Sequence, residues 1–361
     1  NVPRLEDGKF GKAVMVEEET TNLLTANQSS VETNTTGFYT ERSATLTRDS
    51  STSFVGSASL KVVTPGAQVN EGFSTADADI TGSFPAGTSF TFSCYLKGTG
   101  TVTLLLYVPG GSIFASKTVA LTSSWQRYSV SGSLTASATS IRPYVWTDVA
   151  QAITFWADGL QVEQRPYATS WALGASTRSP ETLTIPTAGV LNPQEGTVEF
   201  TVIPSYNWNA NLGRLAGYFG CKGSAYNKSR ILVYKDGNYL RCLFQNTDTT
   251  DVANIAKDIS GFSNKDPLYL AASWKPGRIA FLVNGVLVGE VAATWNVTEA
   301  FTVCYVGAGE SGTVQANALI DDLRISSRAR TDAEIAAAYQ SGQSLPVDEW
   351  TTYLLRFSGA L

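Results

Sequence analysis

Apolar and polar residues alternate through most of this chain, and this alternation predicts short β-strands. In the segment ALIDDLRIS (318–326), a regular strand places Leu319, Asp321, Leu323 and Ile325 on one face. Similar segments recur along the chain, separated by turn signals every 8 to 12 residues or so. The pattern predicts an all-β protein made of two antiparallel β-sandwich domains with jelly-roll topology.

Residues 331–341 break this alternation. Thr331 and Glu334 have the spacing of a capping box, and Ile335, Ala338 and Tyr339 then recur at helical spacing. We therefore expect one short helix near 331–341.

Two separated blocks resemble a single domain. GKFGKAVMVEE (8–18), the stretch from SPETLTIP (179–186) to EGTVEFTV (195–202), LAASWKPGRIAFLVNG (270–285) and ALIDDLRIS resemble LamG-type, concanavalin-like lectin domains. Residues 1–20 and 173–345 are thus predicted to form one discontinuous sandwich, with residues 21–172 inserted into a surface loop. Such an insertion is tolerated because a longer loop adds little closure entropy.

The inserted segment resembles a different family. SLKV (59–62), TFSCYLKG (91–98), SWQRYSV (124–130) and FWADGLQVEQ (155–164) resemble carbohydrate-binding modules of the family 4/9 type. Versions of these modules occur in phage tail proteins and bacterial surface enzymes. The resemblance implies a second jelly roll with a glycan-binding ancestry.

The C-terminal residues 346–361 contain a further strand pattern, YLLRFSGAL (353–361). It resembles the first strand that LamG-type domains carry before the GKFGK phrase. Three interpretations remain open: a permuted strand of the same sandwich, the start of another repeat, or a strand donated to a neighbouring subunit.

Composition and charge exclude several classes of function. The chain has a net charge of −5 and a pI of about 5.0, which argues against a nucleic-acid partner. No apolar run approaches the roughly 20 residues that cross a bilayer, so no membrane insertion is expected. The sequence contains no histidine, which removes Ser-His-Asp and Cys-His catalysis.

Paired carboxylates for glycoside hydrolysis are also missing from the sequence pattern. The glucanases of this fold carry E-x-D-x-E on one strand, whereas Glu195 and Glu199 are four residues apart. Asp321 and Asp322 are neighbours and point to opposite faces of a regular strand. We therefore expect a protein that is not an enzyme.

Two aspartates are candidate ligands of a structural calcium ion. Asp158 shares a regular strand face with Trp156, Leu160 and Val162, and Asp321 lies similarly among leucines. The resemblance to carbohydrate-binding modules implies a calcium site near Asp158, with Glu32 or Asn27 as further ligands. The alternative is that each carboxylate accepts backbone N–H groups.

Sugar binding rests on aromatic residues, because a flat ring stacks on the apolar face of a pyranose. Tyr144 and Trp146 share a strand face, and Tyr107 is a possible companion. A second group lies in polar loops: Tyr206, Trp208, Arg214 and Tyr226. The alternative is that these rings belong to the core.

The four cysteines lack CxxC spacing, which argues against zinc, and Cys221 with Cys242 is a candidate disulfide. The resemblances imply a non-catalytic glycan-binding protein, extracellular or on a virion surface, within a phage tail fibre or a bacterial appendage. The alternative is a structural subunit that assembles into a fibre by strand donation. We expect a homo-oligomer or polymer in either case.

Overall fold

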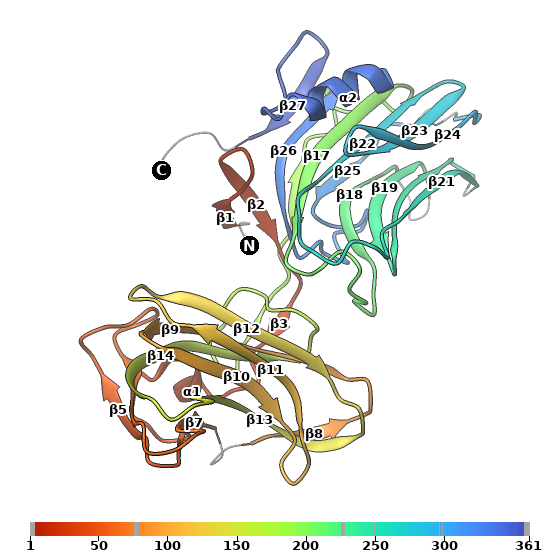
Figure 1. The fold of residues 1–361 in the computed structure, drawn as a ribbon. Helices are drawn as coiled ribbons and strands as arrows, with labels where there is room; N and C mark the ends of the chain where they lie inside the picture. The colour runs from red at the N-terminus through yellow and green to blue at the C-terminus, as the bar shows by residue number, and fades with distance from the viewer. Residues whose placement is uncertain are drawn as a thin grey trace. The chain divides into compact units, whose positions relative to one another are not determined.

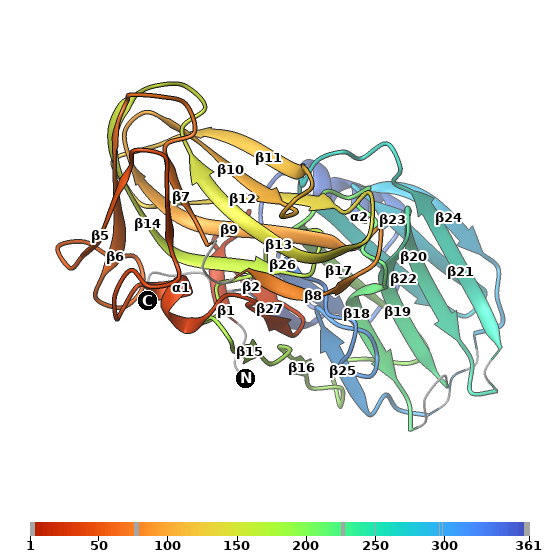
Figure 2. The ribbon, with the colours of Figure 1, turned by 90° about the horizontal axis from the view of Figure 1, so that it is seen from below.

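The computed structural model describes residues 4–75, 79–224, 228–248, 250–295, 297 and 299–356. Antiparallel strands dominate its regular structure, as the alternation predicts (Figures 1 and 2). The chain forms two compact units: Asn1–Glu18 with Ser179–Leu361, here the host unit, and Glu19–Arg178, here the inserted unit. The expected insert, 21–172, lies within the second of these.

The host unit has two sheets with a shared aromatic core. Phe200 of one sheet lies 6.2 Å from Phe219 of the other between ring centroids, and Trp274 lies 5.9 Å from Phe244. The larger sheet runs β1 (Arg4–Asp7), β2 (Lys12–Val16), β26 (Ala318–Ser326), β17 (Gly196–Pro204), β22 (Leu268–Lys275), β23 (Arg278–Val283) and β24 (Val286–Val291), with β27 (Thr351–Leu355) also on β26. The smaller sheet runs β16 (Leu183–Ile185), β25 (Val303–Val306), β18 (Ala216–Lys222), β19 (Arg230–Asp236), β20 (Tyr239–Gln245) and β21 (Asp251–Asp258).

The predicted helix is confirmed as α2 (Asp332–Gln340). Thr331 and Glu334 form the expected reciprocal capping box at its N-terminus. Ile335 is fully buried against Tyr269 and Leu282 of the larger sheet. The apolar spacing in the sequence therefore anchors this helix to the sheet face opposite the aromatic core.

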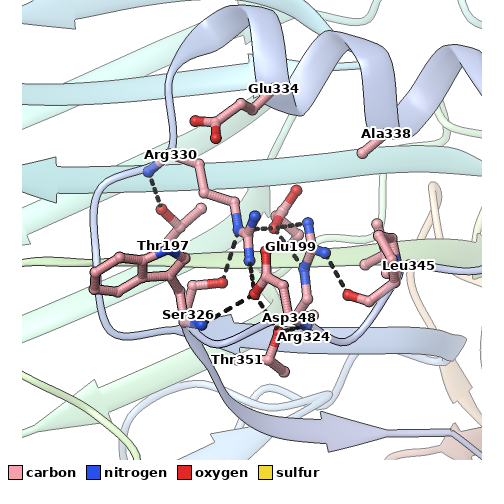
Figure 3. Close-up of polar contacts among 12 residues, drawn as sticks. Thr197, Glu199, Arg324, Ser326, Arg330, Glu334, Ala338, Leu345, Asp348 and Thr351 are labelled. Atoms are coloured by element: carbon pink, nitrogen blue, oxygen red, sulfur yellow. Dashed lines mark hydrogen bonds and ion pairs between the residues drawn. The ribbon is translucent and has the colours of Figure 1, made fainter.

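A buried ion cluster lies beneath α2 (Figure 3). Glu199 accepts hydrogen bonds from Arg324 Nε at 3.0 Å and Nη2 at 2.7 Å, and Tyr269 donates its hydroxyl to the other carboxylate oxygen. Arg330 Nε lies 3.5 Å from the same Glu199 oxygen. Because Glu199 is 0% exposed and doubly paired, its carboxylate holds the sheet together and has no access to solvent.

The same arginines fix the segment that follows α2. Arg324 Nη1 donates to the Pro346 carbonyl at 2.7 Å, and Arg330 Nη2 pairs with Asp348 at 2.7 Å. Arg330 holds the pKa of Asp348 well below its ordinary value through this hydrogen bond. The ion cluster thus connects the sheet to the chain that leads into β27.

Both ends of the chain pair with β26. Strand β2 occupies one half, with Met15 opposite Leu319, and β27 occupies the other half, with Leu355 opposite Leu323. In this structure the C-terminal strand is therefore paired within its own chain, which corresponds to the permuted arrangement. Residues 357–361 of the predicted segment lie outside the described residues.

A bulge in β26 corrects the predicted face of Asp321. Asp322 has a φ of 52°, and the pairing of β26 with β17 shifts register at this point. Asp321 consequently shares its face with Arg324 and Glu199, while Leu323 faces the core. A regular strand would have grouped Asp321 with Leu323, so that prediction is wrong.

The inserted unit also consists mainly of two sheets, which enclose one apolar core containing Phe92, Leu104, Val145 and Phe155. One sheet runs β11 (Ile113–Ala120), β10 (Thr101–Tyr107), β13 (Ala138–Trp146), β7 (Gly72–Ser74) and β4 (Tyr39–Glu41), with β8 (Ile80–Phe84) on β13. The other runs β12 (Gln126–Ser133), β9 (Ser89–Gly98), β14 (Ala152–Glu163), β6 (Ser59–Pro65) and β5 (Thr45–Asp49). A short pair, β3 (Thr20–Thr21) and β15 (Thr177–Arg178), joins the two ends of the unit.

Strand β14 contains a bulge like that of β26. Gly159 has a φ of 56°, and the register with β9 shifts between Asp158 and Gln161. Asp158 and Trp156 therefore lie on the outer face, whereas Leu160 and Val162 belong to the core. The predicted grouping of Asp158 with Leu160 and Val162 is thus wrong for the same reason as in β26.

A second helix, α1 (Ala26–Ser30), was not expected from the sequence. Thr25 and Gln28 form its capping box, so the same signal that predicted α2 was present here. The helix is only five residues long, and its sequence ANQSS has no apolar periodicity. The sequence therefore offers no apolar periodicity from which this helix could be predicted.

The cysteines do not match the predicted disulfide. All four are buried free thiols, and Cys221 lies against Cys304, with a distance of 3.2 Å between the sulfurs. These two residues are directly opposite on β18 and β25, whereas Cys242 lies on β20. The pairing of Cys221 with Cys242 is therefore not present.

Candidate functional site

Three aromatic rings form a continuous row on the outer face of the sheet that contains β10 and β13. Strand register places Tyr107 opposite Arg142 and the next outward residue, Leu105, opposite Tyr144. The ring centroids of Tyr107 and Tyr144 are 5.9 Å apart, and those of Tyr144 and Trp146 are 5.0 Å apart. We call Tyr107, Tyr144 and Trp146 the aromatic row.

The middle ring of the row is supported by its neighbours. Tyr144 is 8% exposed, while Tyr107 and Trp146 remain half-buried at either side. Burial raises the pKa of Tyr144, and its hydroxyl accepts a hydrogen bond from Arg142 Nη1 at 3.1 Å. Tyr144 therefore acts as a fixed spacer between two more accessible rings.

A bidentate ion pair fixes one end of the row. Arg142 Nε donates to Asp79 Oδ1 at 2.6 Å, and its Nη2 donates to Asp79 Oδ2 at 2.9 Å. This fork geometry holds the guanidinium in the plane of the carboxylate. Because Arg142 is compensated by Asp79, this end of the row carries little net charge.

A carboxylate orients the ring at the other end. Trp146 donates its indole N–H to Asp148 Oδ1 at 3.2 Å, and Thr118 donates to Asp148 Oδ2 at 3.0 Å. Gly72 lies opposite Trp146 on β7, where a Cβ atom would stand 2.7 Å from the Trp146 Cα. Asp148 thus orients the ring, and only glycine fits at position 72 because β7 and β13 approach closely there.

Further polar groups extend the same face. Ser74 lies opposite Tyr144 and donates its hydroxyl to Glu41 at 2.6 Å. Tyr39 follows on the edge strand β4 and is 51% exposed. The face therefore combines flat apolar rings with carboxylate, hydroxyl and guanidinium groups, which is the combination that pyranose binding requires.

The strand alternation placed Tyr144 and Trp146 on a common face with Tyr107 as a candidate companion, but Asp79, Glu41 and Tyr39 were missed. The one available signal was Arg142, which stands two residues before Tyr144 on the same strand. Tyr39 and Glu41 lie on β4, and Asp79 lies just before β8. Because these segments are remote from β13 in the sequence, only the tertiary structure brings them to the row.

The second predicted aromatic group is not an exposed platform. Tyr206 and Trp208 are 2% and 0% exposed, so neither ring can stack on a sugar. Tyr206 shares a hydrogen bond of 2.9 Å with the Tyr218 hydroxyl, and Trp208 donates to the Asp266 carbonyl at 2.8 Å. The expected exposure of these rings is therefore wrong, because the polar loop folds its aromatics inward.

Arg214 and Tyr226, the other two predicted sugar-binding residues of the polar loops, do not form an exposed aromatic surface either. Arg214 pairs with Glu18 at 2.8 Å and donates to the Gln315 carbonyl at 3.3 Å. Tyr226 lies outside the described residues. Arg214 therefore serves to hold two segments of the host unit together.

Two of the predicted calcium ligands converge on one loop of the inserted unit. Asp158 accepts the N–H groups of Phe54 at 2.7 Å and Val55 at 2.9 Å. Glu32 accepts the N–H of Ser57 in the same loop at 2.9 Å. Burial and the nearby charge of Glu32 raise the pKa of Asp158 to about 6, and a bound cation would relieve both effects.

These two carboxylates supply only part of a calcium shell. Among the described residues, no three histidine, cysteine, aspartate or glutamate side chains gather as a metal site. Backbone carbonyls of the loop would have to complete the coordination. Calcium at Asp158 and Glu32 therefore fits the donor types present and stays a prediction.

The other two predicted ligands do not join this site. Asn27 accepts the N–H of Thr33 at 3.1 Å and donates to the Thr36 carbonyl at 2.9 Å, which closes the turn after α1. Asp321 belongs to the host unit, where it accepts the N–H of Phe10 at 2.9 Å. Asp321 thus accepts a backbone N–H, as in the alternative interpretation, and Asn27 holds the turn after α1.

No helix among the described residues is long and apolar enough to span a membrane. No curated protein matches the chain. Solved structures resemble parts of it, with TM-scores too low to carry an argument.

An arabinose-bound α-L-arabinofuranosidase has 16% identity and a TM-score of 0.34, with 41% of this chain and 26% of that chain covered. The binding domain of botulinum neurotoxin serotype D has 13% identity and a TM-score of 0.34, with 42% and 38% covered. A xylan-binding domain from Paenibacillus barcinonensis has 13% identity and a TM-score of 0.31, with 44% and 99% covered. The chain thus spans well under half of the first two structures.

One comparison agrees with the motifs of the host unit. The matched segment includes β17, β22, β26 and the start of α2, which are the elements that carried the resemblance in the sequence. Residues 179–336 match the family model of the concanavalin A-like lectin/glucanases superfamily.

Proposed function

We propose that this chain is a non-catalytic glycan-binding protein, and that the aromatic row of the inserted unit is its principal binding surface. The observation that carries this proposal is the arrangement of Tyr107, Tyr144 and Trp146 on one sheet face, with centroid spacings of 5.9 and 5.0 Å. The planes of Tyr107 and Tyr144 stand at 89° and those of Tyr144 and Trp146 at 58°, so the two more accessible rings, Tyr107 and Trp146, would each contact a separate apolar patch of a saccharide chain.

The charges around the row favour a neutral glycan. Arg142 is compensated by Asp79, and the carboxylates of Asp148 and Glu41 lie on the same face. Hydroxyl groups of a neutral sugar can donate to these carboxylates, whereas an anionic sugar would be repelled. We therefore infer a neutral polysaccharide, displayed on a cell or in an extracellular matrix, as the ligand class.

The host unit would carry this binding unit within a larger extracellular assembly. A phage tail fibre or a bacterial appendage is the setting that the sequence resemblances favour. In this proposal the described carboxylates of the host unit have structural roles: Glu199 is buried against two arginines, and Asp321 holds a backbone turn.

The test is a glycan array followed by calorimetric titration of the full chain with neutral oligosaccharides. Replacing Trp146 with alanine should weaken binding at least about tenfold, which corresponds to ~1.4 kcal/mol. Trp350→Ala is a matched control, because this exposed tryptophan belongs to the host unit. Unchanged affinity in Trp146→Ala, or no neutral ligand for the intact chain, would refute the proposal.

The alternative is a fibre subunit that donates its C-terminal strand. In this structure β27 pairs with β26 of its own chain, so donation would require the same pairing to form between subunits. The oligomeric state of the purified chain, measured by light scattering, separates these arrangements. A monomer that binds glycans supports the main proposal and contradicts the fibre.

A further inference from the structure

A second surface on the inserted unit has a different chemistry from the aromatic row. The outer face of the sheet β12-β9-β14-β6-β5 contains an open pocket of about 580 Å³, lined by Trp156, Lys97, Val63 and Thr154, among others. Trp156 lies on this face between the core residues Phe155 and Ala157. Nothing in the proposed neutral-glycan site uses these residues.

The tryptophan is held in a fixed orientation at the pocket. Its indole N–H donates to Asp49 Oδ2 at 2.8 Å, and Asp49 also accepts the Ser51 N–H at 2.8 Å. The ring remains half-buried, so part of it faces the pocket. Hydrogen bonds from Ser51 and the indole lower the pKa of Asp49 to about 2, and the charge of Lys61 contributes to this shift.

Two lysines flank the ring from the neighbouring strands. Strand register places Trp156 directly opposite Lys97 of β9 on one side and Lys61 of β6 on the other. Lys61 Nζ lies 5.8 Å from the ring centroid. Lys97 Nζ is 3.4 Å from the Thr52 hydroxyl, which is a weak contact for an ammonium group.

Lys97 lines this pocket and Lys61 lies over the Trp156 ring beside it, and together they give the site a positive character. Within the described ranges, neither ammonium group forms an ion pair with a carboxylate; Asp49, which is bound to Trp156 and Ser51, acts on Lys61 only as a longer-range charge. Hydroxyl groups of Thr154, Thr99 and Ser123 complete the lining. An apolar ring between two cations, with hydroxyls around it, matches a sugar that carries a negative charge.

We propose that the pocket around Trp156 binds an anionic pyranose, with its apolar face on the indole and its carboxylate or sulfate group between Lys61 and Lys97. The ring supplies stacking, and each lysine supplies a charge-assisted hydrogen bond. The inserted unit then carries two glycan sites of opposite preference on its two sheets: neutral sugars on the aromatic row and anionic sugars here. This site does not depend on the proposed function of the row.

The experiment titrates the full chain with three probes: an oligogalacturonate, a sulfated neutral-backbone oligosaccharide, and an unsubstituted xylo-oligosaccharide. We expect binding of at least one anionic probe, with affinity falling as salt rises because both lysines contact the anion. Replacing Trp156 with alanine should weaken that binding at least about tenfold, equal to ~1.4 kcal/mol. Trp156→Phe, which keeps a flat ring, should restore much of it.

Charge is tested separately from stacking. Lys97→Gln and Lys61→Gln should each weaken anionic binding and reduce its salt dependence, whereas Lys117→Gln on the exposed strand β11 should change neither. Comparison of the galacturonate with the sulfated probe identifies which anion is preferred, and preference for either supports the site. These variants should keep the thermal unfolding temperature of the parent protein, which shows that the pocket is still folded.

Two outcomes would overturn the proposal. One is that neither anionic probe binds the parent chain at millimolar concentration. The other is that Trp156→Ala and Lys97→Gln leave anionic binding unchanged. Trp146→Ala separates the two sites: it should weaken neutral binding without affecting anionic binding, so either site can fail while the other stands.

Discussion

The carboxylate of Asp321 accepts the backbone N–H of Phe10 at 2.9 Å, although 311 residues separate them in the sequence. Its neighbour Asp322 binds the other end of the chain, through Arg356 Nε at 2.7 Å and the N–H of Leu345. The bulge between these two aspartates turns their side chains to the two terminal segments. One dipeptide of β26 therefore holds both ends of the host unit.

Removing the carboxylate of Asp321 should destabilise the host unit. Asp321→Ala leaves the N–H of Phe10 without its acceptor at a nearly buried site, which costs ~1–3 kcal/mol. We expect a lower thermal unfolding temperature by calorimetry. Asp7→Ala is the matched control, because Asp7 pairs with Lys12 on the surface, and it should change stability little. Equal effects of the two substitutions would contradict this role of Asp321.

Deleting residues 348–361 should destabilise the host unit and spare the inserted unit. The deletion removes β27 and leaves half of one β26 edge unpaired. It also removes two ion pairs, between Arg330 and Asp348 and between Arg356 and Asp322. Calorimetry should show a lower unfolding temperature for the host unit, and light scattering should show self-association. Neutral-glycan binding should persist. A stable monomer with unchanged unfolding would show that β27 contributes nothing to this sheet.

The stability of the host unit should rise with pH between about 8 and 10.5 through Lys235. Burial lowers the pKa of Lys235 from its ordinary 10.5 to about 8, although its ammonium donates to the Ala210 carbonyl at 2.8 Å. In this range the unfolded chain holds the lysine proton and the folded chain has released it. The unfolded state binds more protons, so the free energy of unfolding increases with pH.

The size of this contribution should be on the order of 2 kcal/mol across that range. Urea titrations at pH 8 and 10 measure it, and Lys235→Met should flatten the difference. Lys257→Met serves as the control in the same sheet, on β21, where the lysine is only half-buried. A pH dependence that is the same in Lys235→Met and in the parent chain would rule out Lys235 as its source.

Calcium should stabilise the inserted unit through Glu32 and Asp158. A cation near these two carboxylates would relieve their repulsion and the burial cost of Asp158. We expect millimolar calcium to raise the unfolding temperature, and a chelator to lower it. Glu32→Gln should abolish the response while Glu19→Gln keeps it. If calcium has no effect on the parent chain, hydrogen bonds alone hold this loop.

Cys221 and Cys304 should be the first pair of cysteines to crosslink. Their sulfurs lie 3.2 Å apart on directly paired residues, while Cys94 and Cys242 have no such neighbour within the described structure. Mild oxidation followed by peptide mass spectrometry should therefore yield a Cys221–Cys304 disulfide. Cys304→Ser should prevent it. A product that joins Cys221 to Cys242 would contradict the register of β18 and β25.

The local periodicity of the sequence determined much of this protein. Alternation in SIRPYVW places Tyr144 and Trp146 on one strand face, since successive residues of a regular strand point to opposite sides. The Thr331–Glu334 spacing determined where α2 begins, because a capping box involves only residues within one turn. The family phrases within residues 179–336 indicated a concanavalin-like sandwich, and this segment matches that family model.

Tertiary structure decided the features that depend on departures from regular geometry or on distant partners. The bulges at Gly159 and Asp322 reverse the alternation, so that Asp158 and Asp321 lie on outer faces. Burial of Tyr206 and Trp208, and the pairing of Arg142 with Asp79, depend on segments that are remote in sequence. A periodic pattern carries no information about such contacts, because they form only when separate strands meet.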